Sequence, residues 1–297
     1  MSLQGLLTEQ LNPASQGIDE RPTLDILQII NREDQQVVSA VAAEISKIAQ
    51  AVDRIAAGIR NGGRLFYIGA GTSGRLGILD ASECGPTFQA PVEMVQAIMA
   101  GGEEAAVRAT ETSEDDPESG RRDLMARHFT SRDALVAIAA SGRTPYVLGA
   151  AEAARAVGAL TIGISCTPDS ELSRRVDIAI TPLTGPEVIA GSTRMKAGTA
   201  TKLVLNMIST AVMIRLGFVY GNLMVNVQPK NSKLEDRARR IIVASVQVSY
   251  EKAGELLNAA EGSVPTAIVM ARLAVDRASA EAKLAAAGGR ISDALRM

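Results

Sequence analysis

Short β-prone runs alternate with helical segments through the middle of the chain, and this alternation limits the possible folds more than any other feature. The runs fall at residues 64–68, 94–98, 135–139, 160–165 and 178–181. Alternating strands and helices predict a parallel sheet covered by helices on both faces, with ligands bound in the loops that follow the strands. With 46% hydrophobic residues among 297, the chain can bury such a core. We therefore expect a three-layer α/β fold.

Helical patterns flank this central region on both sides. Before it, apolar residues recur at helical spacing over residues 25–60, after an irregular arm that contains prolines. After it, we expect one long helix over residues 192–218 and an alanine-rich helical tail over residues 241–297. We predict an N-terminal arm with helices at residues 1–54, an α/β domain at 55–222 and a small helical domain at 235–297.

Composition excludes several classes of partner. The net charge is −2, no dense run of one sign occurs, and aromatic residues make up 3%, so we expect no nucleic-acid partner. The two cysteines, Cys84 and Cys166, predict neither a disulfide scaffold nor a metal site. The start of the chain lacks the pattern of a signal peptide. Because Asn206 and Arg215 interrupt the apolar stretch at 203–219, we expect a buried helix, no membrane span and a cytoplasmic location.

Two of the expected strands end in loops rich in glycine and hydroxyl groups, "GAGTSGR" at residues 69–75 and "SGRTP" at 141–145. Glycine lets the backbone approach a ligand, and the hydroxyls with the N–H groups of the next helix suit a phosphate. The first loop also fits the Gly-x-Gly-x-x-Gly pattern of dinucleotide sites. That pattern needs an acidic residue after the next strand, which instead runs into Met99 and two glycines. A phosphate ligand is therefore favoured, with unliganded turns as the alternative.

These two loops resemble those of the phosphosugar-binding sugar isomerase (SIS) fold. The stretch "GPEVIAGSTRMKAGTATKLVLNMIST" at 185–210 closely resembles the signature shared by the bacterial N-acetylmuramic acid 6-phosphate etherase family and the glucokinase regulatory protein. "LTEQLNPAS" near the start and "LMVNVQPKNSKL" after the long helix are also similar to the etherase family. The resemblance spans nearly the whole chain and implies an SIS domain whose parallel sheet lies between helices.

The resemblance also implies a carbon–oxygen lyase whose ligand is a small 6-phosphosugar. The lactyl ether of N-acetylmuramic acid 6-phosphate would be removed by elimination and water addition, giving N-acetylglucosamine 6-phosphate and D-lactate. This chemistry needs two proton-transfer groups and no cofactor or metal. SIS domains commonly pair, so we expect a homodimer. A non-catalytic sugar-phosphate sensor and an aldose–ketose isomerase remain alternatives.

The family motifs assign roles to particular residues, one position at a time. By resemblance, Glu83 and Glu114 are the acid–base pair, although a glutamate in either setting is ordinarily a solvated surface group. Substrate and phosphate contacts are expected from Gly71, Thr72, Ser73, Ser141, Gly142, Thr144, Ser192, Arg194 and Lys196. Salt bridging at the start of the long helix is the alternative for Arg194 and Lys196.

Other chemically active residues have simpler interpretations. Ala139 stands where SIS proteins often carry another phosphate-binding serine. His128, the single histidine, is expected at the surface, and Cys84 is expected to be a buried thiol because elimination needs no nucleophile. Glu187 is a weaker candidate for the site.

Overall fold

The computed structural model describes residues 7–108 and 114–297, which form two compact units. The first unit combines Met1–Ser82 with Val92–Thr210, and the second combines Glu83–Pro91 with Ala211–Met297. The N-terminal helices therefore share a unit with the sheet. The three-part division at residues 54, 222 and 235 stays a prediction.

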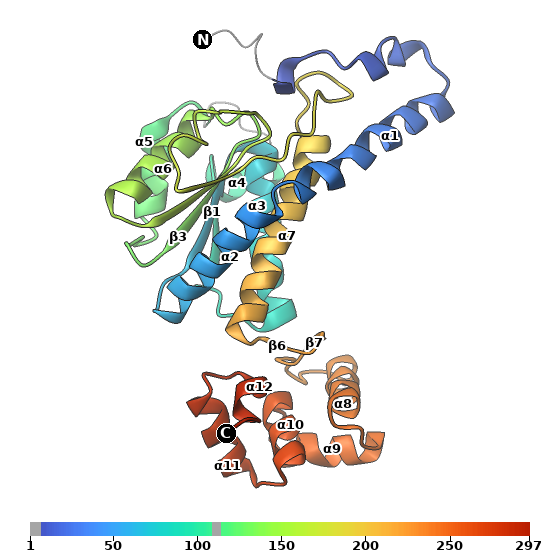
Figure 1. The fold of residues 1–297 in the computed structure, drawn as a ribbon, viewed down its shortest axis with the longest axis vertical. Coiled ribbons are helices and arrows are strands. Elements are labelled where there is room, and N and C mark those ends of the chain that lie inside the picture. Colours follow the sequence, from blue (N-terminus) through green and yellow to red (C-terminus); the bar gives the residue numbers. More distant parts are fainter. Residues whose placement is uncertain (1–6, 109–113) are drawn as a thin grey trace. The chain divides into compact units, whose positions relative to one another are not determined.

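Five parallel strands form the sheet of the first unit, in the order β2-β1-β3-β4-β5 (Figure 1). They are β1 Leu65–Gly69, β2 Val95–Met99, β3 Ala134–Ile138, β4 Leu160–Ile164 and β5 Ile178–Ile180. The predicted alternation is confirmed, and each strand ends within one residue of the expected run. The strand order reverses between β1 and β3, so the loops after these neighbouring strands open on one crevice.

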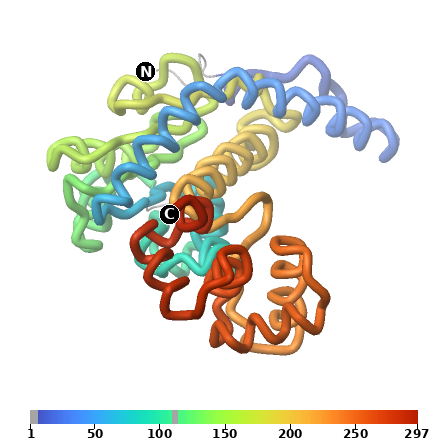
Figure 2. Tube along the Cα trace, turned by 60° about the horizontal axis from the view of Figure 1, so that its bottom comes forward, coloured from blue at the N-terminus to red at the C-terminus, as the bar shows by residue number. Residues whose placement is uncertain are grey.

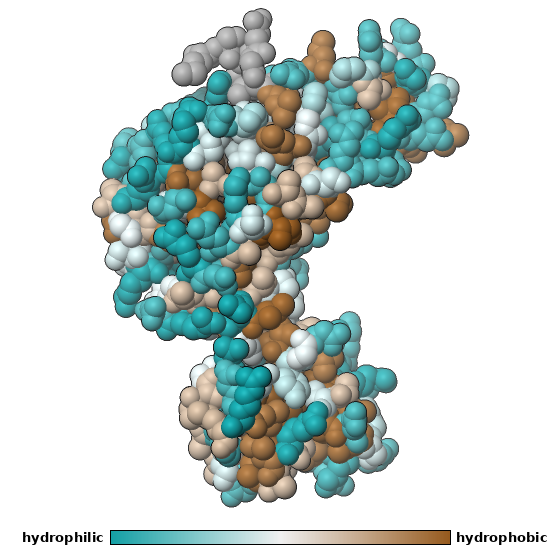
Figure 3. All heavy atoms as spheres, viewed as in Figure 1, coloured by the Kyte–Doolittle hydropathy of each residue, from teal (hydrophilic) through white to brown (hydrophobic). Residues whose placement is uncertain are grey.

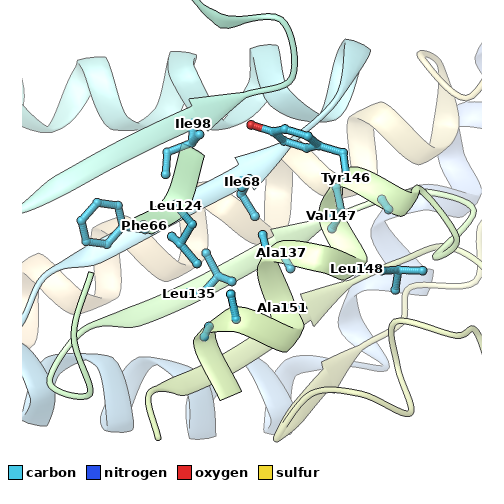
Figure 4. Packing of buried hydrophobic residues seen from close by; sticks show 14 of the residues in the cluster. Phe66, Ile68, Ile98, Leu124, Leu135, Ala137, Tyr146, Val147, Leu148 and Ala151 are labelled. Carbon is cyan, nitrogen blue, oxygen red and sulfur yellow. The ribbon is translucent and has the colours of Figure 1, made fainter. Parts of the chain in front are cut away.

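The alternating side chains of β1 attach helices to opposite faces of the sheet. The covering helices are α2 Ile45–Arg60, α3 Gly71–Phe88, α4 Gly102–Val107, α5 Pro117–Met125 and α6 Pro145–Ala156. Phe66 and Ile68 belong to the apolar cluster that includes Leu124 of α5 and Tyr146 of α6 (Figure 4). Tyr67 points to the other face, because successive strand side chains alternate.

A buried carboxylate joins the layers on the Tyr67 side of the sheet. Asp80, on α3, accepts hydrogen bonds from the Tyr67 hydroxyl at 2.8 Å and from Asn206 Nδ2 at 2.7 Å. The hydroxyl of Ser209 also donates to it at 3.1 Å. Asn206 and Ser209 lie on α7, Lys196–Leu216, so one side chain fixes β1, α3 and α7 together.

Helix α7 is the one helix among residues 7–108 and 114–297 that is long and apolar enough to cross a membrane. However, 56% of its most apolar window is buried within the protein. The buried helices of soluble proteins share this composition, and the α/β fold around α7 is of the soluble type. The prediction of a buried helix is confirmed.

Three 3₁₀ turns lead into the first long helix. They lie at Leu7–Glu9, Pro13–Ser15 and Ile18–Glu20, and α1 follows at Thr23–Ala42. Asn12 caps the second turn, since its side-chain oxygen accepts from the Ala14 N–H at 2.9 Å. The arm is therefore ordered by local capping before it reaches α1.

The second unit is a group of short helices (Figure 2). It has an apolar core of its own. It contains β6 Val219–Tyr220, β7 Leu223–Met224, α8 Ser232–Val246, α9 Tyr250–Ala259, α10 Val264–Leu273, α11 Arg277–Ala286 and α12 Ile291–Ala294. Side-chain oxygens cap four of these helices at Asn231, Ser249, Ser263 and Asp276. The predicted helical tail is confirmed.

Candidate functional site

The loop between β1 and α3 is shaped by close backbone contact. A Cβ added to Gly69 would lie 2.7 Å from the Gly74 nitrogen, and one added to Gly74 would lie 2.7 Å from the Gly69 oxygen. Side chains at either position would push the strand and helix apart. Thr72 and Ser73 are half-buried in the first turn of α3, where unpaired N–H groups favour an anion.

The loop between β3 and α6 has a similar form. Gly142 has a φ of 67°, and a Cβ there would lie 2.3 Å from Ser170 Oγ. Ser141 Oγ accepts a hydrogen bond from the Arg143 N–H at 3.3 Å. Thr144 stands at the N-cap of α6, but its side chain makes no capping hydrogen bond. Both predicted phosphate loops therefore follow paired strands and carry half-buried hydroxyls.

Glu114 lies against the first of these loops. A Cβ added to Gly71 would be 3.1 Å from Glu114 Oε1. The Glu114 carbonyl accepts from the Tyr146 N–H at 3.0 Å, which ties this residue to the start of α6. The structure thus brings a predicted catalytic carboxylate to the predicted phosphate loops.

Glu83 has a different position. It is exposed on α3, ten residues after Ser73. A rise of about 1.5 Å per residue separates the two by about 15 Å along the helix axis. The C3 atom of a 6-phosphosugar lies only a few bonds from its phosphate. Glu83 therefore lies nearly three helical turns from the phosphate loop of its own chain.

The signature segment before α7 is held by its own carboxylate. Glu187 is 1% exposed and accepts from the backbone N–H groups of Lys196 and Ala197, both at 2.9 Å. It caps a helix nine residues later in the chain, which local patterns could not indicate. Ser192 is half-buried and Arg194 is exposed in this segment.

The first turn of α7 lies beside the first turn of α3. The Cβ position of Gly198 is 3.6 Å from Thr72 Cγ2 and 3.5 Å from the Thr193 oxygen. Two helix N-termini therefore meet near residues 192–194, and their partial positive charges favour an anionic ligand.

Lys196 makes an internal ion pair. Lys196 is fully buried, and Nζ lies 2.6 Å from Glu33 Oε2 on α1. The sequence leaves substrate binding and salt bridging open for Lys196, and the structure contains an ion pair. Burial raises the pKa of Glu33, but hydrogen bonds from Lys196 and Asn12 outweigh burial, so the pKa is lowered overall. Nothing in the spacing of residues indicated Glu33 or Asn12.

Neither cysteine is placed for nucleophilic catalysis. Cys84 is 3% exposed, as expected. Burial, together with the charge of Glu187, raises the pKa of Cys166 to about 12. His128 is exposed, as predicted. No three metal-ligating side chains gather among the residues that the structure describes.

A cavity of about 580 Å³ is lined by other residues, from β2 and the helices α3, α4, α5 and α6. Met99, Glu103, Arg122, Asp123 and Tyr146 contribute to its lining, and no predicted site residue does. Volume alone therefore does not locate the candidate site, which the two hydroxyl loops define.

Comparison with known proteins places the fold in a class. The model of the SIS domain matches residues 112–211, and that of the "glucokinase regulatory protein N-terminal SIS domain" matches residues 47–155. A solved structure from Bacteroides fragilis, described as a phosphosugar isomerase of capsule formation, has a TM-score of 0.50. It is 20% identical and covers 66% of this chain and 94% of its own. The sheet-containing unit is thus an SIS domain.

Curated relatives narrow the assignment. The N-acetylmuramic acid 6-phosphate etherase of Photorhabdus laumondii is 53% identical, over 91% of this chain and 90% of its own. That of Caldanaerobacter subterraneus is 50% identical, over 100% of this chain and 97% of its own. The chain belongs to the N-acetylmuramic acid 6-phosphate etherase family.

Proposed function

We propose that this chain is a cytoplasmic carbon–oxygen lyase that removes the D-lactyl ether from N-acetylmuramic acid 6-phosphate. The products are N-acetylglucosamine 6-phosphate and D-lactate. Similarity to etherases at 50–53% identity over nearly the whole chain carries this proposal. The position of Glu114 beside a glycine-rich loop at the β1 end fits it.

The substrate phosphate binds between the two loops. Ser73, Ser141 and Thr144 supply hydroxyls, and the N-termini of α3 and α6 supply backbone N–H groups and favourable dipoles. The glycines at 71 and 142 let the backbone approach the phosphate oxygens. A 6-phosphate is therefore the group that anchors the sugar.

Glu114 is the base for the C2 proton. In the ring-opened sugar the C1 aldehyde makes this proton acidic, and the electron pair of the broken C–H bond passes into an enolate. That pair then forms the C2–C3 double bond while the C3–O bond breaks, and Glu83 protonates the departing lactyl oxygen. Water adds at C3, and C2 regains a proton. Two carboxylates thus perform the proton transfers.

Glu83 acts in the site of a second copy of the chain. Its separation of about 15 Å from Ser73 along α3 places it well away from the phosphate loop of its own chain. Its exposure leaves the carboxylate accessible to a partner. The active form is therefore a homodimer.

Apolar surface on the N-terminal region supports a dimer. Leu11, Leu24 and Leu27 are 83%, 65% and 57% exposed, on the arm and the first half of α1. This region extends away from the sheet, and hydrophobic side chains lie on its surface (Figures 1 and 3). A second copy of the chain would bury these leucines at an interface, which the hydrophobic effect favours.

Product analysis tests the proposed reaction. The chain is incubated with N-acetylmuramic acid 6-phosphate, and D-lactate is measured. Release of lactate identifies the etherase, whereas an isomerised sugar without lactate identifies an isomerase. Binding without turnover identifies a sensor, the alternative that the match to the glucokinase regulatory protein domain favours. The Glu114→Gln variant serves as the control for contaminating activity.

A further inference from the structure

A buried polar network joins the N-terminal arm to the signature segment. The Glu33 carboxylate on α1 accepts from Lys196 Nζ at 2.6 Å and from Asn12 Nδ2 at 2.7 Å. Gln36 Nε2 donates to its other oxygen at 3.2 Å. Asn12 Nδ2 also donates to the Pro186 carbonyl at 3.1 Å. One carboxylate therefore links three parts of the chain that are distant in sequence.

The same arm supports the signature segment at a second point. The Gly191 N–H donates to the Thr8 carbonyl at 3.1 Å, and Thr8 is 2% exposed. Asn12 holds the segment near its start through Pro186, and Lys196 follows its end. The segment that carries Ser192 and Arg194 is thus attached to the arm and α1.

The charge of Lys196 is satisfied inside the protein. Its ammonium is fully buried beside Glu33, whose lowered pKa keeps that carboxylate ionised at neutral pH. A buried lysine that donates to an internal carboxylate is poorly placed to bind an anionic substrate as well. Its role is to connect α7 to α1.

We propose that Glu33 and Asn12 are positioning residues for the substrate, acting through Lys196 and the 185–195 segment. They hold Ser192 and Arg194 beside the first turn of α3 before the substrate arrives. This inference rests on the proposed function of that segment in binding the sugar. Without the network, binding must first order the segment, which opposes binding because each fixed residue loses conformational entropy.

A double variant separates an effect on substrate binding from an effect on the stability of the fold. Replacing a buried ion pair by apolar residues of similar volume is often neutral for folding, whereas removing one partner is strongly destabilising. Glu33→Leu combined with Lys196→Met should therefore unfold near the wild-type midpoint. Its KM for N-acetylmuramic acid 6-phosphate should rise about tenfold, equal to about 1.4 kcal/mol, with a smaller change in kcat.

A partly buried ion pair in the same unit provides the control. Asp133 accepts from Arg64 Nη2 at 2.9 Å and from the Thr130 N–H at 2.7 Å, at the amino ends of the strands. Asp133→Asn should lower the unfolding midpoint and leave KM unchanged. A similar rise in KM would mean that disturbing any ion pair in this unit raises KM, and the proposal would be wrong.

Two further outcomes decide the proposal. A folded double variant with wild-type KM overturns it, and so does a hundredfold loss of kcat at constant KM, which would make Lys196 catalytic. If the double variant does not fold, Asn12→Ala decides, because it detaches Pro186 and keeps the ion pair. Its KM should also rise, and a wild-type KM refutes positioning. Absence of turnover by the wild-type protein would instead refute the proposed function.

Discussion

Mixing two inactive variants tests whether Glu83 works across a dimer. Ten residues of α3 separate Ser73 from Glu83, which corresponds to about 15 Å at the helical rise. If Glu114 acts in its own chain and Glu83 in the partner's site, each site of a two-fold dimer takes one carboxylate from each chain. Glu83→Gln and Glu114→Gln alone should each reduce turnover about 10²- to 10⁴-fold, the usual contribution of an acid or base.

Mixed dimers should recover a defined fraction of activity. When the two variants are co-expressed in equal amounts, half of the dimers contain one of each. In such a dimer one site has both glutamates and the other has neither, so lactate release should reach about one quarter of the wild-type rate. Differently tagged chains allow the mixed dimer to be isolated and assayed directly.

The refuting result is equally definite. Recovered mixed dimers that stay as inactive as the parents would show that both carboxylates serve a site within one chain. Ser141→Ala mixed with Glu114→Gln is the matched control. Both changes fall in the loops of one chain's site, so this pair should not restore turnover at low substrate concentration.

Three further predictions concern single properties of the chain. Ser141→Ala should raise KM about 10- to 100-fold, since a hydrogen bond to a charged group contributes about 1.5–3 kcal/mol, and steady-state kinetics measure this. Gly142→Ala should lower the free energy of unfolding by more than about 1 kcal/mol in urea titrations, because its positive φ and the nearby Ser170 leave no place for a methyl group. The pKa of Glu33 in the folded protein is lowered from its usual value of 4.5. The ionised carboxylate therefore stabilises the folded state above pH 4.5, and this stabilisation is lost as the pH falls through the pKa of the folded protein. Glu33→Gln should therefore flatten acid unfolding below about pH 4.5, as followed by circular dichroism; unchanged acid sensitivity would exclude this contribution.

The sheet could be predicted because its signals are local. Each strand is a short β-prone run bounded by loop residues, and β1 at Leu65–Gly69 differs from the expected run by one residue. The long helix was expected to begin at residue 192, but α7 begins at Lys196. Its cap comes from Glu187, nine positions before Lys196, so no cap residue stood at the usual place.

The site was only partly predictable, for a related reason. The two hydroxyl loops follow from sequence because each is a contiguous motif after a strand. The ion pair of Lys196 with Glu33 spans 163 positions, and an isolated glutamate on an amphipathic helix carries no local sign of such a partner. The position of Glu83 also depends on helix length, since a motif shows which residue is present but not which site it reaches.

The second unit is formed by two separate stretches of the chain, and this has a consequence for protein synthesis. After residue 91, the ribosome adds 120 residues to reach residue 211, where the rest of that unit begins. At about 5–20 residues per second, the interval is roughly 6 to 24 s. During this time Cys84 and Phe88, which are 3% and 8% exposed in the finished fold, have not met the remainder of their unit. The end of α3 therefore cannot complete its packing until the residues from 211 onward have been made.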